Sequence, residues 1–176
     1  RSTQRHRHLR IANAVNECWT EWASRSLEGA LAPHLNTFLF PERPGVLSRE
    51  YSVYDLRHAF LKDENVVSVL RVAEERLRGR TYFTNSPVMN ICDVIVACAM
   101  YYPFTFLISR KERESTYPNL LRHYLSCMRT SRFRNLFGEA MLYENIVSTS
   151  TASSSSSSKS SEIVSLESLR CAAKSM

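Results

Sequence analysis

Glycine is scarce in this chain: only 4 of its 176 residues are Gly, against an average near ~7% in globular proteins. Sheet proteins use glycine at many of their tight turns, so the shortage argues against a fold built from hairpins. The longer segments instead repeat their apolar residues every three or four positions, which is the period of a helix. We therefore expect an all-α protein with one domain of ~100–150 residues and appendages.

The five cysteines do not form the close pairs of a zinc site or of a disulfide-bonded secreted domain. They are Cys18, Cys92, Cys98, Cys127 and Cys171. Their odd number and irregular spacing favour free thiols in a reducing compartment. Cys92, Cys98 and Cys127 fall on apolar helix faces, where we expect small buried side chains. We predict no metal site.

Motifs of catalysis and nucleotide binding are also missing. The chain has no Gly-rich loop to hold phosphates and no glycine-flanked nucleophile at a strand-to-helix turn. Composition alone leaves room for a catalytic triad, since five histidines are present. The favoured interpretation is nevertheless a protein that is not an enzyme, with no catalytic residue and no cofactor.

One run, residues 91–108, is almost wholly apolar and approaches the length of a membrane span. Asp93 and Pro103 interrupt it, and no second run follows, so we expect no membrane association. We predict a helix at the centre of a bundle, where a helix that is apolar all round also belongs. A secretory signal is absent, which favours the cytoplasm. The acid-free, arginine-bearing start keeps a mitochondrial location as the alternative.

Positive charge is concentrated at the start of the chain. The formal net charge is +6, and four arginines precede the first acidic residue, Glu17. They are Arg1, Arg5, Arg7 and Arg10. The rest of the chain is therefore nearly neutral, and we interpret residues 1–8 as a flexible basic arm. RNA contact through this arm is the alternative, although no strand-borne aromatic signature of an RNA module accompanies it.

Apolar stripes and helix breakers divide the body, residues 9–147, into five or six expected helices. The first stripe runs from Leu9 to Ala23, and a turn-rich connection is expected from Pro33 through 41–45. A short helix is expected after Ser52, followed by a stripe over 66–77 that Gly79 ends.

Local capping signals mark the helices of the second half. Asn90 and Asp93 have the spacing of a capping box, in which each side chain accepts a hydrogen bond from the other's backbone N–H. Pro118 suits the first turn of a helix. Between these two helices, residues 110–114 are interpreted as a charged link. The last expected helix passes through 133–137 and is capped by Gly138.

Serine dominates the segment after the body. Ten of the residues in 148–161 are Ser, so the segment has almost nothing to bury and is expected to be a disordered linker. Beyond it, Ile163, Leu166 and Leu169 step by three. A short helix that docks on a partner is the alternative to a disordered tail over 148–176.

Several blocks of this chain resemble the C-terminal helical domain of the glutathione transferase superfamily, and within it the gamma subunit of translation elongation factor 1. That subunit has Phe-Pro-Asn, then Arg-Trp-Phe, Phe-Arg and Leu-Gly-Glu. The matching positions here are Tyr117, Pro118, Asn119; Arg122, His123, Tyr124; Phe133, Arg134; and Phe137, Gly138, Glu139. Further likeness lies at Leu142, Tyr143 and Glu144, and upstream at Trp19, Trp22, Pro33, Phe38 to Pro41 and Gly45.

The resemblance spans roughly residues 10–146 and implies a glutathione-transferase C-terminal-like bundle. In that superfamily, a preceding thioredoxin-like domain holds glutathione. No βαβ segment precedes the first long helix here, so the resemblance implies no glutathione chemistry. The chain departs from the family where a Gly is replaced by Asn85 or Ser86, a Trp by His123, and a Pro by Ser131.

The resemblance implies a noncatalytic scaffold module that holds protein partners in a translation-related assembly. Expected partners are elongation factor or aminoacyl-tRNA synthetase components, or a second copy of the chain. In related synthetase domains the helix of Arg122 takes part in domain pairing, so Arg122 is a candidate to meet an acidic partner, or else a plain solvated arginine.

Trp19 and Trp22 share a helix face. They are core residues or, since Trp is enriched at binding hot spots, a contact surface. Two alternative functions stay open for the whole protein: a diverged transferase half acting with a separate thioredoxin-like domain, and an RNA-tethering module.

Overall fold

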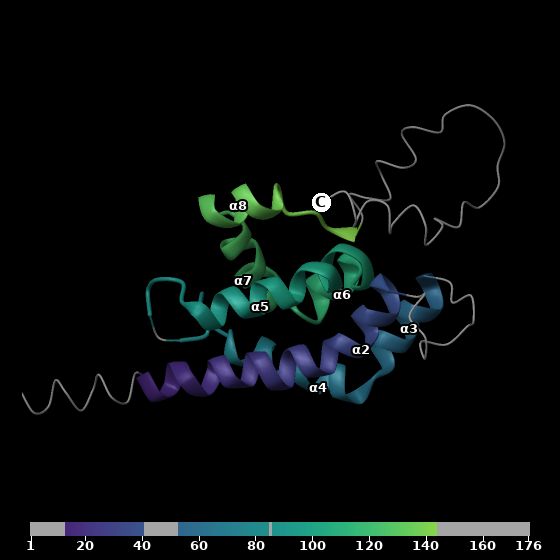
Figure 1. The fold of residues 1–176 in the computed structure, drawn as a ribbon, viewed down its shortest axis with the longest axis horizontal. Helices are drawn as coiled ribbons and strands as arrows, with labels where there is room; N and C mark the ends of the chain where they lie inside the picture. Colours follow the sequence, from purple (N-terminus) through teal and green to yellow (C-terminus); the bar gives the residue numbers. More distant parts are fainter. Residues whose placement is uncertain (1–12, 41–52, 85, 144–176) are drawn as a thin grey trace, which may run out of the picture.

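The computed structural model describes residues 13–40, 53–84 and 86–143, and all regular structure within them is helical (Figure 1). A helix over 13–22 continues through the π-helical turn η1 (Ala23–Leu27) into α2 (Glu28–Leu39). The elements that follow are α3 (Val53–Lys62), α4 (Glu64–Arg76), α5 (Ile91–Tyr102), η2 (Pro103–Leu107), α6 (Arg110–Ser115), α7 (Pro118–Met128) and α8 (Ser131–Phe137). The predicted all-α class is confirmed for this part of the chain.

Helices α2 to α8 alone make seven, against the five or six that were predicted. The basic arm, the connection over 41–52, Asn85 and the Ser-rich tail lie outside the described residues. The boundaries proposed for the arm, the body and the tail therefore stay predictions.

Helix α5 lies at the centre of the molecule, as its apolar sequence predicts. It packs against η1, α2 and α7, while η2 continues it toward α3. Figure 1 shows α5 beside the long N-terminal helix, with α7 leading from this layer toward α8. The residues that α5 buries are Cys92, Asp93, Val96, Ala97, Met100 and Tyr101. None of the described helices has the length and apolar character needed to cross a lipid bilayer.

The prediction that Pro33 begins the connection after the first helix is wrong. Pro33 lies inside α2, which continues to Leu39. Proline in a helix removes one backbone donor and crowds the carbonyl four residues earlier, here that of Gly29. The helix nevertheless continues through Pro33 for six more residues, so this proline did not mark its end.

The segment 110–114, predicted to be a charged link, is instead part of helix α6. Ser109 and Glu112 form a complete capping box at its start, with the Ser109 N–H donating to Glu112 Oε2 over 2.8 Å. The helix is polar on almost every side, and Arg113 is its buried residue. It was missed because a helix without an apolar stripe leaves no periodic signal.

Asn90, Pro118 and Gly138, which the sequence predicts as caps, each lie at a helix end. Asn90 and Asp93 form the capping box of α5. Pro118 occupies the first turn of α7. Gly138 ends α8 with φ of 74°, and Gly79 follows α4 with φ of 69°. Both angles lie in the left-handed region, which glycine adopts without the steric penalty of a side chain.

Candidate protein-binding surface

A buried carboxylate, Asp93, connects three segments of the molecule. Its Oδ2 accepts a hydrogen bond from the Asn90 N–H over 2.9 Å, which closes the capping box. Its Oδ1 accepts the Phe83 N–H over 2.8 Å and faces His123 Nε2 at 3.1 Å. The side chains of Asp93 and His123 are fully buried. Asp93 therefore starts α5, holds the segment before it and anchors α7, whereas the sequence indicated only the first of these roles.

The buried polar cluster of Asp93, His123 and Cys127 lacks the arrangement of a catalytic triad. In a triad, the acid and the nucleophile contact opposite nitrogens of the histidine ring. Here Cys127 Sγ lies 3.7 Å from Nε2, the same nitrogen that faces Asp93. Burial raises the pKa of Cys127 to about 12, and that of Cys92 likewise. Both thiols stay protonated at neutral pH, so neither is an activated nucleophile.

Cys98, predicted to be buried with the other two, is exposed on α5. Cys92 and Cys127 are buried as predicted. The sequence run around Cys98 is apolar on every side, so it carries no information about which side of α5 faces solvent.

The two tryptophans form an aromatic cluster with Phe83. The ring centroids of Trp19 and Trp22 lie 5.3 Å apart, and those of Trp19 and Phe83 lie 5.6 Å apart, both in edge-to-face contact. Trp22 stacks on Phe83 at 5.8 Å. The Arg76 guanidinium lies over the Trp19 ring at 4.7 Å. Both tryptophans are partly buried against the core, so each has a structural contact and an accessible part.

Arg122 projects from α7 and contacts the end of α4. Its Nη2 donates to the carbonyl of Leu77 over 2.9 Å and to that of Arg80 over 2.8 Å. The side chain is neither simply solvated nor in contact with an acid among the described residues. Its predicted contact with a partner stays a prediction, and the structure adds an intramolecular role that the sequence did not indicate.

Glu74 of α4 caps the start of α7 across 45 residues of sequence. Its carboxylate accepts the Asn119 N–H over 3.0 Å and the Leu120 N–H over 2.8 Å. Because Pro118 begins α7, the N–H groups of the next two residues have no partner within the helix. A carboxylate at this end also opposes the positive pole of the helix dipole. The sequence gives no local signal for this role of Glu74, because the residues that it caps lie 45 or 46 positions away.

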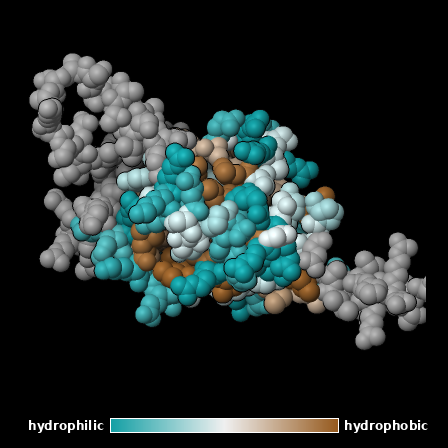
Figure 2. Space-filling view, turned by 180° about the vertical axis from the view of Figure 1, so that it is seen from behind, coloured by the Kyte–Doolittle hydropathy of each residue, from teal (hydrophilic) through white to brown (hydrophobic). Residues whose placement is uncertain are grey.

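The surface carries scattered apolar residues. On the face that Figure 2 shows, hydrophobic residues emerge in separate areas between hydrophilic ones. The large apolar side chains that are exposed come from different segments: Val15, Phe40, Val72, Val88, Ile91 and Leu136. A groove of about 330 Å³ lies between the η1–α2 segment and the start of α4, and it is lined by small, polar and apolar residues. Apolar side chains that are exposed singly are usual on protein surfaces and do not by themselves mark a binding site.

The chain is similar in sequence to elongation factor 1-gamma of three vertebrates, although no family model matches it. It is 27% identical over 126 residues to the protein of Sus scrofa, a match that covers 72% of this chain and 27% of that protein. It is 29% identical over 83 residues to the protein of Carassius auratus, covering 47% of this chain and 18% of the relative. The similarity supports a distant relation to elongation factor 1-gamma.

The match to the protein of Danio rerio is 26% identical over 83 residues. The chain thus corresponds to less than a third of the length of each of these curated relatives. The relation and the all-helical architecture of the described residues agree with the resemblance found in the sequence. The glutathione-transferase C-terminal-like arrangement of the helices stays a prediction.

Proposed function

We propose that this chain is a noncatalytic helical module that binds protein partners in a translation-related assembly. The observation that carries the proposal is the similarity to elongation factor 1-gamma over 126 residues, which extends along 72% of the chain. The partners we propose are other components of elongation factor 1 or of aminoacyl-tRNA synthetase assemblies, and the setting is the cytoplasm.

The interior of the molecule supports a structural use of its reactive side chains. Asp93, His123 and Cys127 are fully buried and bonded to one another or to backbone. Raised pKa values keep the buried thiols of Cys92 and Cys127 protonated. In our proposal, these buried polar groups stabilise the fold. Partner binding would then use residues on the surface. Trp19, Trp22 and Arg122 are our candidate contact residues.

The proposal is tested by using the whole tagged chain as bait in a cell lysate and identifying the captured proteins by mass spectrometry. We expect enrichment of elongation factor 1 or synthetase components over bait-free resin. Each captured component is then purified and its direct binding to the chain is measured by calorimetry. Recovery of none of these components, or failure of all of them to bind directly, would refute the proposal.

A catalytic alternative is checked with the same protein. Glutathione conjugation of a chromogenic electrophile is measured with the folded chain and with buffer alone. Conjugation above the uncatalysed rate that increases in proportion to the concentration of the chain contradicts the noncatalytic assignment. We expect the uncatalysed rate in both.

A further inference from the structure

Three arginine side chains converge on the turn that follows α4. Arg76 Nε donates to the carbonyl of Phe83 over 2.7 Å. Arg80 Nη1 donates to the carbonyl of Arg76 over 3.0 Å. Arg122 Nη2, from α7, donates to the carbonyls of Leu77 and Arg80. We call Arg76, Arg80 and Arg122 the arginine cluster.

Within the part of the chain that the structure describes, none of the three guanidinium groups forms an ion pair with a carboxylate. The two acidic residues nearest in sequence are already engaged. Glu75 pairs with Arg78 at 3.2 Å, and Glu74 caps α7. Among the described residues, the cluster is therefore a concentration of positive charge that backbone carbonyls and, at Arg76, the Trp19 ring balance.

Most of the hydrogen-bonding capacity of the cluster is unused by the contacts described. A guanidinium carries five N–H donors in a fixed planar fork, and each of these three uses the donors of a single nitrogen. Arg80 and Arg122 are exposed, and Arg76 is partly so. Their existing bonds restrict the side chains before any partner arrives, which lowers the entropy cost of binding.

The geometry points to carboxylates rather than nucleic-acid bases as the ligand of this cluster. The neighbouring aromatic rings are partly exposed but already contact protein groups: Trp19 lies under Arg76 and against Phe83, and Tyr82 contacts His123 edge to face. Binding of single-stranded RNA relies on bases stacked on open aromatic rings. A guanidinium fork matches the paired oxygens of a carboxylate or of a phosphate, and a protein partner in the proposed assembly supplies carboxylates.

We propose that the arginine cluster binds an acidic segment of the protein partner, one rich in Glu or Asp. The inference rests on the proposed function, because it supplies the chemistry of the contact that a scaffold module makes there. The surface unites the end of α4, the turn after it and α7, so the partner recognises the packed arrangement of these elements rather than one helix alone.

The test uses the full chain and three labelled probes: octaglutamate, octalysine and octauridylate. Fluorescence anisotropy should show octaglutamate binding that weakens as salt rises, no octalysine binding and weaker octauridylate binding. Arg80→Glu should weaken octaglutamate binding by about tenfold or more, since it replaces a charged hydrogen bond with repulsion. The more conservative Arg80→Gln should give a smaller loss in the same direction, which covers the case in which Arg80→Glu is unstable.

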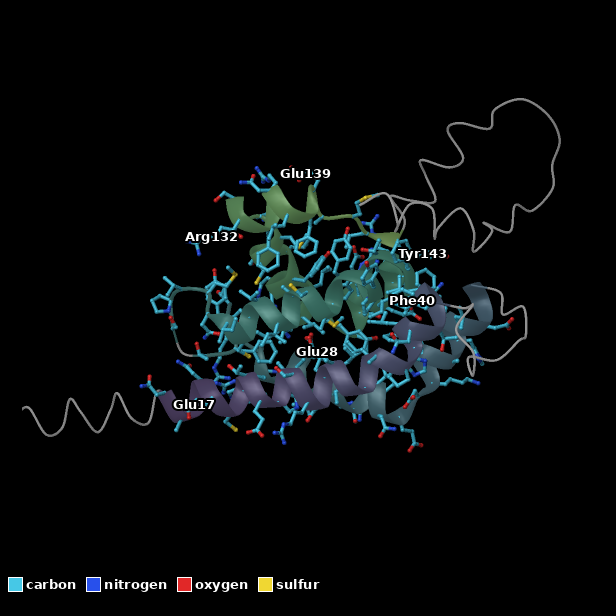
Figure 3. All side chains as sticks on the ribbon, in the orientation of Figure 1. Glu17, Glu28, Phe40, Arg132, Glu139 and Tyr143 are labelled. Atoms are coloured by element: carbon cyan, nitrogen blue, oxygen red, sulfur yellow. The ribbon has the colours of Figure 1, made fainter. Side chains whose placement is uncertain are left out.

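The matched control is Arg132→Glu, which makes the same change of charge at an exposed arginine on α8 (Figure 3). We expect it to alter octaglutamate binding by less than about twofold, because salt screens exposed charges that lie apart. Equal losses in the Arg80→Glu and Arg132→Glu variants would indicate attraction by net charge alone and overturn the inference. So would the absence of octaglutamate binding, or tighter binding of octauridylate.

Capture from lysate separates this inference from the proposed function. If Arg80→Glu captures elongation factor or synthetase components as well as the unaltered chain does, the arginine cluster is not the contact while the proposed function stands. If the unaltered chain captures none of them but binds octaglutamate through Arg80, the cluster stands and the proposed function fails.

Discussion

At the scale of single residues, Asp93 connects the start of α5, the segment before it and α7. One fully buried carboxylate accepts hydrogen bonds from two backbone N–H groups and faces a buried histidine. Its capping role could be predicted because both members of the capping box lie three residues apart. Its contact with His123 could not, because the two residues are 30 positions apart. His123, which looked like a departure from the family pattern, is the residue that meets this carboxylate.

Replacing Asp93 with alanine should lower the free energy of unfolding by about 3 kcal/mol or more, because a helix cap and a buried charged acceptor are lost together. Urea denaturation monitored by circular dichroism measures the change. The matched control is Glu114→Ala, whose carboxylate pairs with Arg110 on the exposed side of α6. It should change stability by less than about 0.5 kcal/mol. Similar losses in the two variants would rule out a central role for Asp93.

At the scale of elements, the helices are held in place by contacts between the end of one and the beginning of another. Glu74 of α4 caps α7, and Arg122 of α7 donates to the carbonyls after α4. Glu74 supplies the acceptor that two N–H groups at the start of α7 lack, and Arg122 adds a second hydrogen bond to the Leu77 carbonyl, which already accepts the Arg80 N–H. Such reciprocal contacts fix the position of α7, and with it the place of the arginine cluster.

Glu74→Ala should reduce the free energy of unfolding by about 1–2 kcal/mol, because two N–H groups at the start of α7 lose their acceptor. Hydrogen exchange of the Asn119 and Leu120 amides should also become faster in Glu74→Ala, because these two N–H groups lose their acceptor. The adjacent Glu75 provides the control, since its carboxylate pairs with Arg78 at the surface. Glu75→Ala should cost less than about 0.5 kcal/mol. If exchange at Asn119 and Leu120 is unchanged by Glu74→Ala, the cap does not operate in solution.

At the scale of the whole molecule, carboxylates that bridge helices make stability depend on pH. Burial opposes the ionisation of Glu112, but hydrogen bonds from Ser109 and Arg57 outweigh it and hold the pKa below its usual 4.5. The hydrogen bond from His34 and the Asn65 N–H hold the pKa of Asp63 below its usual 3.8. Arg57 links α3 to α6, and His34 links α2 to α4.

A carboxylate whose pKa is lower in the folded state stabilises the fold fully above its unfolded pKa, and this stabilisation is lost as the pH falls through the folded value. The protein should therefore lose stability below about pH 4.5. Glu112→Gln, which cannot ionise, should be less stable at neutral pH and should show a flatter decline between about pH 5 and about pH 3. Thermal melting at several pH values measures this slope.

The exposed Glu139 on the segment after α8 is the control for the acid experiment, since its side chain is 83% exposed. Glu139→Gln should keep the pH dependence of the unaltered protein. A decline of identical slope in Glu112→Gln and the unaltered chain would show that the bridge between α3 and α6 does not contribute.

The sequence by itself determined the helical class, the central position of α5 and the caps at Asn90, Pro118 and Gly138. These features depend on residues within about one or two helical turns of one another, and local spacing records them. Where a local signal was overridden or absent, as at Pro33 inside α2 and in the polar helix α6, the sequence prediction failed.

Only the tertiary structure decided which side chains meet across the molecule. Glu74 reaches Leu120, His123 reaches Asp93, and Arg122 joins Arg76 and Arg80 around one turn. These residues lie tens of positions apart, and no local rule of spacing relates them. Their proximity results from how the apolar faces of several helices pack together, and that packing creates both the buried polar centre and the charged surface.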